Sequence, residues 1–161
     1  MQTMYERYHR ITGALIKNNL TITTMESCSG GILGLLLSDR EGASAVVPGG
    51  FFTYANASKI ACGVPQDVIE SYGVYSAETA CAMAAACKAS YHTAIGIGVT
   101  GSIGTVDPNN ADSVPGEVFL AVDGPDGVTT QTLTLTPDTR HRCRLQIADA
   151  VADILEAHYV R

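Results

Sequence analysis

The order of apolar and polar positions along the chain predicts helices alternating with strands. Residues 3–19 carry apolar side chains at spacings of four, three and four, which form one stripe of an amphipathic helix. Residues 20–26 alternate β-branched side chains and predict a strand, and the apolar run over 29–38 predicts the next helix. The stripe of the first helix consists of Met4, Tyr8, Ile11 and Leu15.

The middle of the chain predicts one strand and three helices. Residues 45–54 predict a strand that proline and glycine interrupt. Short helices are expected over 56–62 and over 65–72, where proline suits the first helical position. A longer helix is expected over 76–90, with Ser76 as its cap. Because that helix consists largely of alanine and cysteine, we expect it to pack closely on a sheet.

The second half of the chain predicts three further strands. The stretch 93–101 is apolar on both faces, which is typical of a central strand. A polar loop follows over 102–114, with Asp107-Pro-Asn-Asn110 at its tip. Strands over 116–123 and 127–136 are joined by a Gly-Pro-Asp-Gly turn, so they form an antiparallel hairpin.

The final helix extends to the C-terminus, and Asp138 or Thr139 is placed to cap it. Its apolar positions form two adjoining stripes, which predict a broad buried face. Helices that alternate with strands define an α/β fold. We therefore expect a single layered α/β/α domain over residues 1–161, with a mixed, mostly parallel sheet and a C-terminal antiparallel hairpin.

Composition and charge restrict the class of protein. Of the 161 residues, 46% are hydrophobic and 16% are charged, which is typical of a globular chain with a substantial core. The net charge of −6 and the lack of a basic stripe argue against nucleic-acid binding. No apolar run approaches the ~20 residues that span a bilayer. The charged start and the five cysteines without a C-x-x-C pair predict a cytoplasmic protein.

Two familiar kinds of site are not supported. The segment Gly96-Ile-Gly-Val-Thr-Gly101 matches G-x-G-x-x-G, but its glycines lie inside a strand and no helix follows to receive a pyrophosphate. We interpret these glycines as positions at which a neighbouring helix packs closely. The four histidines show no metal-ligand spacing and no carboxylates cluster with them. We therefore expect neither a metal nor a cofactor.

The most informative segment is the strand-to-helix turn Glu26-Ser-Cys-Ser-Gly-Gly31. Such a turn lies at the carboxyl edge of a sheet, where free helix N–H groups favour an anion or an oxyanion. Three small nucleophiles are adjacent there, namely Ser27, Cys28 and Ser29. The residue types alone leave three interpretations open: a helix cap through either serine, a thiol activated by the helix dipole, or a serine nucleophile.

A second cluster follows the strand expected over 45–54. A strand that ends in a short helix could bring Tyr54, Asn56 and Lys59 to one edge of the sheet. A lysine that is desolvated there has its charged form disfavoured, so it could act as the base for a serine. The alternative interpretation is a surface lysine beside a core tyrosine.

Three arginines lie at the start of the last helix, namely Arg140, Arg142 and Arg144. Cations near a helix N-terminus oppose the helix dipole, so the cluster is unfavourable unless it faces an acid or an anion. Arg140 and Arg144 are four residues apart and share one face, whereas Arg142 points elsewhere. The alternative interpretation is a solvated helix face.

Together, the segments Thr21–Gly31 and Gly49–Lys59 resemble the CinA C-terminal-domain family. They match its patterns Thr-x-Thr-Thr-x-Glu-Ser-Cys-x-Gly-Gly, where x after Cys is Ser or Thr, and Gly-Gly-x-x-Thr-Tyr-x-Asn-x-x-Lys. Further matches at Gly73–Ser76 and Thr100-Gly101 extend the resemblance over nearly the whole chain. Characterised members of the family are nicotinamide mononucleotide (NMN) deamidases.

The resemblance implies a serine amidohydrolase that works without a metal and converts NMN to nicotinate mononucleotide and ammonia. Carried across by position, Ser27 is the nucleophile, Lys59 the general base and Tyr54 a proton-relaying or orienting hydroxyl. Backbone N–H groups of the turn would hold the oxyanion, and Arg140 would meet the 5′-phosphate or fix the loop that does. The substrate-binding residues implied in this way are Arg140, Cys28, Ser29, Gly30, Gly31, Gly50, Asn56, Thr100 and Gly101.

The segment 102–118 departs from the family pattern. The family continues with Ile-Ala-Gly-Pro and later with Lys-Pro-Val-Gly-Thr-Val, whereas this chain has Ser102-Ile-Gly-Thr and Val114-Pro-Gly-Glu-Val. The alternatives to an NMN deamidase are therefore an amidase with a shifted substrate and a catalytically silent nucleotide-binding or regulatory domain. We expect a pyridine mononucleotide as the partner, with no nucleic acid and no membrane. A homodimer is compatible with the small-residue helix.

Overall fold

The computed structural model describes all 161 residues. The fold is built on a five-stranded sheet of order β2-β1-β3-β4-β5. β1 (Ile22–Glu26) pairs in parallel with β2 (Phe51–Phe52) on one side and with β3 (Ile95–Gly101) on the other. β4 (Glu117–Gly124) and β5 (Gly127–Thr134) form the antiparallel hairpin, and β4 is also antiparallel to β3. The sheet is therefore mixed, as predicted, and only β4 runs against the direction of the other strands.

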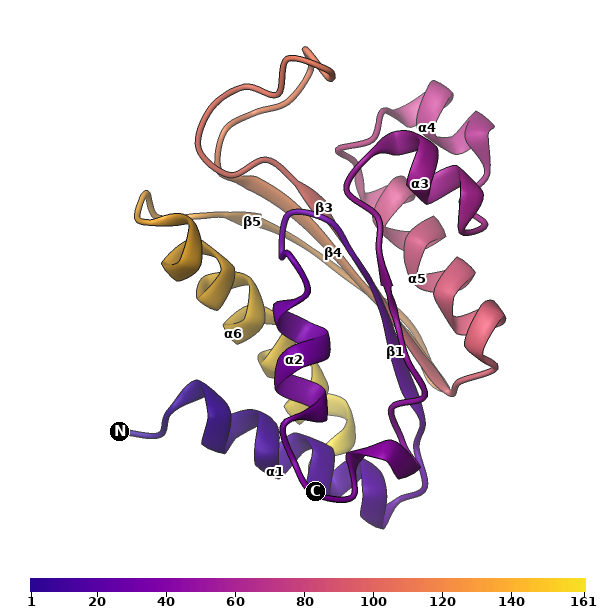
Figure 1. Ribbon diagram of the computed structural model, residues 1–161, viewed down its shortest axis with the longest axis vertical. Coiled ribbons are helices and arrows are strands. Elements are labelled where there is room, and N and C mark those ends of the chain that lie inside the picture. Colours follow the sequence, from indigo (N-terminus) through magenta and orange to yellow (C-terminus); the bar gives the residue numbers. More distant parts are fainter.

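Helices cover both faces of this sheet (Figure 1). One face carries α1, α2 and α6, and the other carries α3, α4 and α5, so the α/β/α layering that the sequence predicts is confirmed. The helices are α1 (Met4–Lys17), α2 (Ile32–Ser38), α3 (Asn56–Ala61), α4 (Gln66–Tyr72), α5 (Ala77–Tyr91) and α6 (Arg140–Tyr159), with a 3-10 turn, η1, at Ala43–Ala45.

Two elements are shorter than the sequence predicts. The region 45–54 contains only the two-residue β2, because a proline and two glycines precede it and end any regular strand. α2 begins at Ile32 rather than at residue 29. The cause is a tight turn in which Gly30 and Gly31 adopt φ angles of 68° and 90°, a left-handed conformation that glycine adopts readily.

α5 packs directly on the backbone of β3, as its small side chains predict. A Cβ atom on Gly98 would lie 2.1 Å from the carbonyl oxygen of Ala80, and one on Gly96 would lie 2.3 Å from that of Ala84. No side chain fits at either position while the helix keeps this distance. The match to G-x-G-x-x-G therefore reflects helix–sheet packing and not a dinucleotide site.

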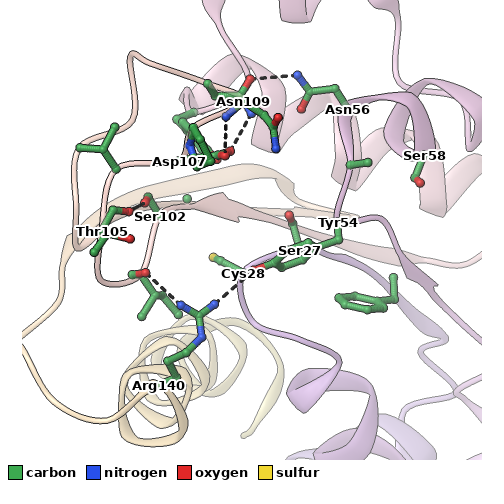
Figure 2. A pocket seen from close by; sticks show the side chains of 18 residues that line it. Ser27, Cys28, Tyr54, Asn56, Ser58, Ser102, Thr105, Asp107, Asn109 and Arg140 are labelled. Carbon is green, nitrogen blue, oxygen red and sulfur yellow. Dashed lines mark hydrogen bonds between the residues drawn. The ribbon is translucent and has the colours of Figure 1, made fainter.

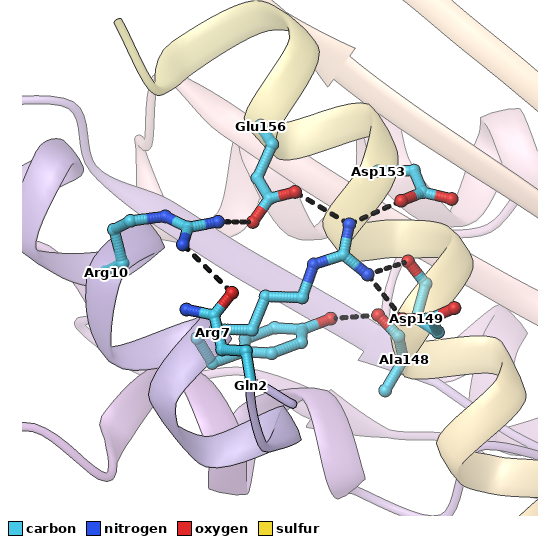
Figure 3. Close-up of polar contacts among 8 residues, drawn as sticks. Gln2, Arg7, Arg10, Ala148, Asp149, Asp153 and Glu156 are labelled. Atoms are coloured by element: carbon cyan, nitrogen blue, oxygen red, sulfur yellow. Dashed lines mark hydrogen bonds and ion pairs between the residues drawn. The ribbon is translucent and has the colours of Figure 1, made fainter.

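The largest part of the core lies between the sheet and the layer of α1, α2 and α6. Polar contacts add to it, because the buried Tyr8 donates to the carbonyl oxygen of Ala148 at 2.7 Å. Arg7, whose side chain is only 16% exposed, makes ion pairs with three acids of α6 (Figure 3). These acids are Asp149, Asp153 and Glu156.

No helix has both the length and the apolar character needed to cross a membrane.

Candidate active site

A cavity of about 820 Å³ lies at the carboxyl end of β1 (Figure 2). Its walls come from five segments: the turn after β1, the stretch from β2 into α3, the connection between α4 and α5, the long loop between β3 and β4, and the start of α6. A volume of this size is within the range of small-molecule sites. The polar residues that matter below are Ser27, Tyr54, Asn56, Tyr75, Asp107, Asn110 and Arg140.

Ser27 and Lys59 form a buried pair at this cavity. Lys59 Nζ lies 3.2 Å from Ser27 Oγ, and the two residues are 1% and 5% exposed. The ammonium group also donates to the carbonyl oxygens of Thr53 at 2.8 Å and Tyr54 at 3.4 Å. The pairing arises because β1 and β2 are adjacent and parallel, so the residues that follow them meet at one edge of the sheet.

Burial changes the proton affinity of this lysine. It lowers the pKa of Lys59 from 10.5 to about 8, because the charged ammonium group loses its hydration, and the nearby Asp107 carboxylate offsets part of this effect. In a fraction of the molecules, the Lys59 side chain is therefore a neutral amine near neutral pH. A neutral amine next to a serine hydroxyl can accept its proton, which is what an activated serine nucleophile requires.

Cys28 does not provide a reactive thiol. Burial raises the pKa of Cys28 to about 12, so the thiol stays protonated near neutral pH. The residue nevertheless lines the cavity next to Ser27, and its backbone N–H has no acceptor oxygen within the chain. The N–H of the residue after a nucleophile is a common oxyanion donor in serine hydrolases.

The turn is stabilised by Glu26, which the sequence analysis did not single out. Its buried carboxylate accepts hydrogen bonds from the N–H groups of Gly31 at 3.1 Å, Leu33 at 3.1 Å and Gly34 at 2.8 Å. Ser29 Oγ donates to the same carboxylate at 2.8 Å. A negative charge at this position also complements the dipole of α2.

This contact corrects two of the interpretations of the turn. The expectation that free N–H groups of this helix would receive a substrate anion is wrong, because the carboxylate of Glu26 already occupies them. The interpretation of either serine as a helix cap, one of the three left open by the sequence, is also wrong, since the cap residue of α2 is Gly31, which has no side chain to cap the helix, and Ser29 donates to Glu26. The only signal in the sequence was an acidic residue directly before the small residues of the turn.

Changing Glu26 to glutamine is expected to lower the free energy of unfolding by roughly 2–4 kcal/mol. The amide has one acceptor oxygen instead of two, and its NH2 group would face backbone donors in a buried place. Urea unfolding of the variant measures the effect. Glu41→Gln, at an exposed position, is the matched control and should unfold like the unchanged chain. Equal stability of both variants would show that the carboxylate does not hold the turn.

Tyr54 lies on the cavity wall, and no hydrogen bond joins its hydroxyl to Ser27 or Lys59. Arg140 Nη2 donates to Tyr54 Oη at 3.2 Å, and Arg140 Nη1 donates to the carbonyl oxygen of Ile103 at 3.1 Å. The Tyr54 residue is 59% exposed. Lys59 contacts Ser27 directly, so the structure places no relaying hydroxyl between them and instead joins Tyr54 to Arg140.

The three arginines of α6 separate as the helical spacing predicts. Arg140 reaches the cavity, and Arg144 Nε donates to the carbonyl oxygen of Cys28 at 3.1 Å. The guanidinium group of Arg144 covers Gly30, where a Cβ atom would lie 2.6 Å from Cζ. Arg142 points away and pairs with an acid of its own segment at 3.7 Å.

The cavity includes only part of the predicted substrate-binding set. The residues of that set that line it are Cys28, Asn56, Gly101 and Arg140. Three of the others lie behind the wall: Ser29 is buried against Glu26, Gly50 packs on Thr24, and Thr100 Oγ1 donates to the carbonyl oxygen of Val74 at 2.9 Å. The remaining members, Gly30 and Gly31, line a separate hollow on the far side of the turn.

The long loop before β4 contributes side chains that the sequence analysis did not assign to the site. The carboxylate of Asp107 accepts hydrogen bonds from Tyr75 Oη at 2.6 Å and from Asn110 Nδ2 at 2.8 Å. These bonds, that of Asn110 first, hold the pKa of Asp107 below its usual value. Asn56 Nδ2 donates to Asn110 Oδ1 at 3.0 Å, which ties the loop to α3. The polar tip of the loop was the only sequence signal.

Fold and site together define an α/β domain in which a buried serine–lysine pair faces a polar cavity at the end of a central strand. Nowhere do three or more His, Cys, Asp or Glu side chains gather as metal ligands. Residues 5–159 match the CinA C-terminal domain family, so the chain belongs to this family.

Several curated proteins and solved structures are similar to this chain. A CinA-like protein from Gemmatimonas aurantiaca is 36% identical over 144 residues, which cover 89% of this chain and 33% of that protein. A putative competence-damage inducible protein from Acetivibrio thermocellus is 37% identical over 131 residues, which cover 81% and 31%. The chain thus spans about a third of the length of the curated relatives it matches.

The solved structures are similar along most of their length. The competence/damage inducible protein CihA from Agrobacterium tumefaciens has a TM-score of 0.86 at 27% identity, covering 98% of each chain. A CinA superfamily protein from Escherichia coli has a TM-score of 0.86 at 25% identity, covering 96% of this chain and 90% of that one. These similarities show that the chain shares the fold of CinA superfamily structures.

Proposed function

We propose that this chain is a serine amidohydrolase that converts NMN to nicotinate mononucleotide and ammonia. The observation that carries the proposal is the buried contact of 3.2 Å between Ser27 Oγ and Lys59 Nζ at the wall of the cavity. The substrate is suggested by the resemblance of the two longest motifs to the family whose characterised members deamidate NMN.

In the proposed reaction, the neutral amine of Lys59 accepts the Ser27 proton while Oγ attacks the carboxamide carbon. The N–H of Cys28, which has no acceptor in the chain, can donate to the resulting oxyanion. The Lys59 ammonium group then returns the proton to the departing nitrogen, and ammonia leaves. Water attacks the Ser27 ester with Lys59 again as the base, which releases the carboxylate product and restores the serine.

Arg140 suits the phosphate end of such a substrate. Its guanidinium group lines the cavity and pairs with no acid. An arginine in this state can bind a phosphate through two parallel hydrogen bonds. The contact with Tyr54 Oη holds the guanidinium group in place, so we assign Tyr54 an orienting role at the cavity wall.

A second candidate function is the hydrolysis of a different carboxamide. It is favoured by the loop between β3 and β4, which departs from the family pattern and places Asp107 and Asn110 in the cavity wall. The proposal for NMN and this alternative use the same Ser27–Lys59 chemistry. They differ only in the group that the loop recognises.

Incubation of the purified chain with NMN tests the proposal. We expect release of ammonia with formation of one equivalent of nicotinate mononucleotide, detected by mass spectrometry, because the serine–lysine pair completes both half-reactions. Free nicotinamide, which lacks the ribose phosphate, should react far more slowly. Turnover of another carboxamide but not of NMN would favour the second candidate. Calorimetric binding of NMN without turnover would indicate a catalytically silent domain.

A further inference from the structure

Two opposite charges face each other across the cavity, with the nucleophile between them. Figure 2 shows Asp107 on the loop along one wall, Arg140 at the start of α6 on the opposite wall, and Ser27 at the side that joins them. Arg140 suits the phosphate in the proposed function. That function gives no role to the carboxylate of Asp107, although it lines the same space.

The Asp107 carboxylate is held in a defined orientation. Tyr75 Oη and Asn110 Nδ2 both donate to Oδ2, and the N–H of Asn109 donates to Oδ1 at 2.9 Å. No cation forms an ion pair with it. Its negative charge nevertheless acts on the side chain of Lys59, since it raises the pKa of Lys59 and so opposes the effect of burial. A fixed, ionised carboxylate without a cationic partner is suited to a cationic ligand.

We propose that Asp107 is a specificity-determining residue that favours carboxamides carried on a positively charged ring over those on a neutral ring. This inference rests on the proposed function. With the phosphate at Arg140 and the carboxamide at Ser27, the ring lies in the space between the walls, within range of the carboxylate. A pyridinium ring carries the positive charge that this wall lacks, whereas a dihydropyridine ring does not.

A comparison of NMN with its dihydropyridine form tests the proposal, because the two molecules share the carboxamide, the ribose and the phosphate. The kcat/KM for NMN divided by the kcat/KM for its dihydropyridine form should fall about tenfold on Asp107→Asn. The intrinsic reactivities of the two amides differ, but that difference is the same in both enzymes and cancels in the change of ratio. Asp112→Asn, in the same loop but outside the cavity wall, is the matched control and should keep the ratio.

Three other outcomes are informative. Equal losses on both substrates would overturn the proposal and indicate that Asp107 only binds ribose hydroxyls or supports the loop. If Asp107→Asn has no measurable turnover, calorimetry on Ser27→Ala with and without Asp107→Asn gives the ratio of the affinities for NMN and for its dihydropyridine form. A ratio that Asp107→Asn leaves unchanged overturns the proposal. If the unchanged chain does not hydrolyse NMN, the proposed function fails, while preferential binding of NMN over its dihydropyridine form that depends on Asp107 would still support the charge preference.

Discussion

Changing Ser27 to alanine is expected to lower the kcat of ammonia release from NMN by at least ~10³-fold. The alanine has no Oγ to attack the carboxamide, and Lys59 is held too firmly by two carbonyl oxygens to replace it. The affinity for NMN should change little, because the hydroxyl is a small part of the cavity wall. Steady-state ammonia release gives kcat, and calorimetry gives the dissociation constant.

Two controls separate this effect from general damage to the site. Cys28→Ala removes the neighbouring thiol, which stays protonated near neutral pH, and should keep activity within about tenfold. Ser38→Ala makes the same chemical change at an exposed position of α2 and should keep full activity. Loss of activity in Cys28→Ala together with normal activity in Ser27→Ala would make the thiol the nucleophile and contradict the assignment.

The pairing of Ser27 with Lys59 was implied by the resemblance to the CinA family, whereas the residue types alone left Ser27, Cys28 and Ser29 as alternatives. Ser27 and Lys59 each follow a strand, and the strands β1 and β2 are neighbours in a parallel pair. Residues that follow the carboxyl ends of such strands meet at one edge of the sheet, which explains why the two motifs of the resemblance lie together in the fold. The layering and the hairpin, in contrast, could be predicted from apolar periodicity and a turn signal alone.

Other features of the site depend on packing that no local pattern reports. Glu26 reaches the start of α2 only because Gly30 and Gly31 turn the chain back, so the helix end that looked free is already occupied. Tyr54 meets Arg140 across 86 positions of sequence, and the contact joins the segment after β2 to the first residue of α6. The orientation of Asp107 likewise depends on Tyr75, which belongs to another part of the chain.

Lys59 should also determine how activity depends on pH. The proposed reaction needs the neutral amine of Lys59, and the pKa of Lys59 in the folded chain is about 8. The value of kcat/KM should therefore rise about tenfold per pH unit below 8 and level off above it. A pH–rate profile of ammonia release measures this. A flat profile between pH 6 and pH 8, at constant ionic strength, would contradict the role of Lys59 as the base.

Changing Lys59 to methionine is expected to abolish ammonia release and, at the same time, to stabilise the fold by roughly 2 kcal/mol near pH 7. The unfolded chain holds this proton with a pKa near 10.5 and the folded chain with one of about 8, so burial of the charged form costs stability below pH 8. Between about pH 8 and 10.5 the unfolded state binds more protons, so the stability of the unchanged chain rises with pH and the variant should lack that rise. Urea unfolding at several pH values measures the stabilisation near pH 7 and the missing rise above pH 8. Lys17→Met, at an exposed position, is the matched control. A buried catalytic base is expected to be kept at the expense of stability. A Lys59→Met variant that loses stability as well as activity would therefore show that Lys59 supports the fold, and would contradict its assignment as a destabilising catalytic base.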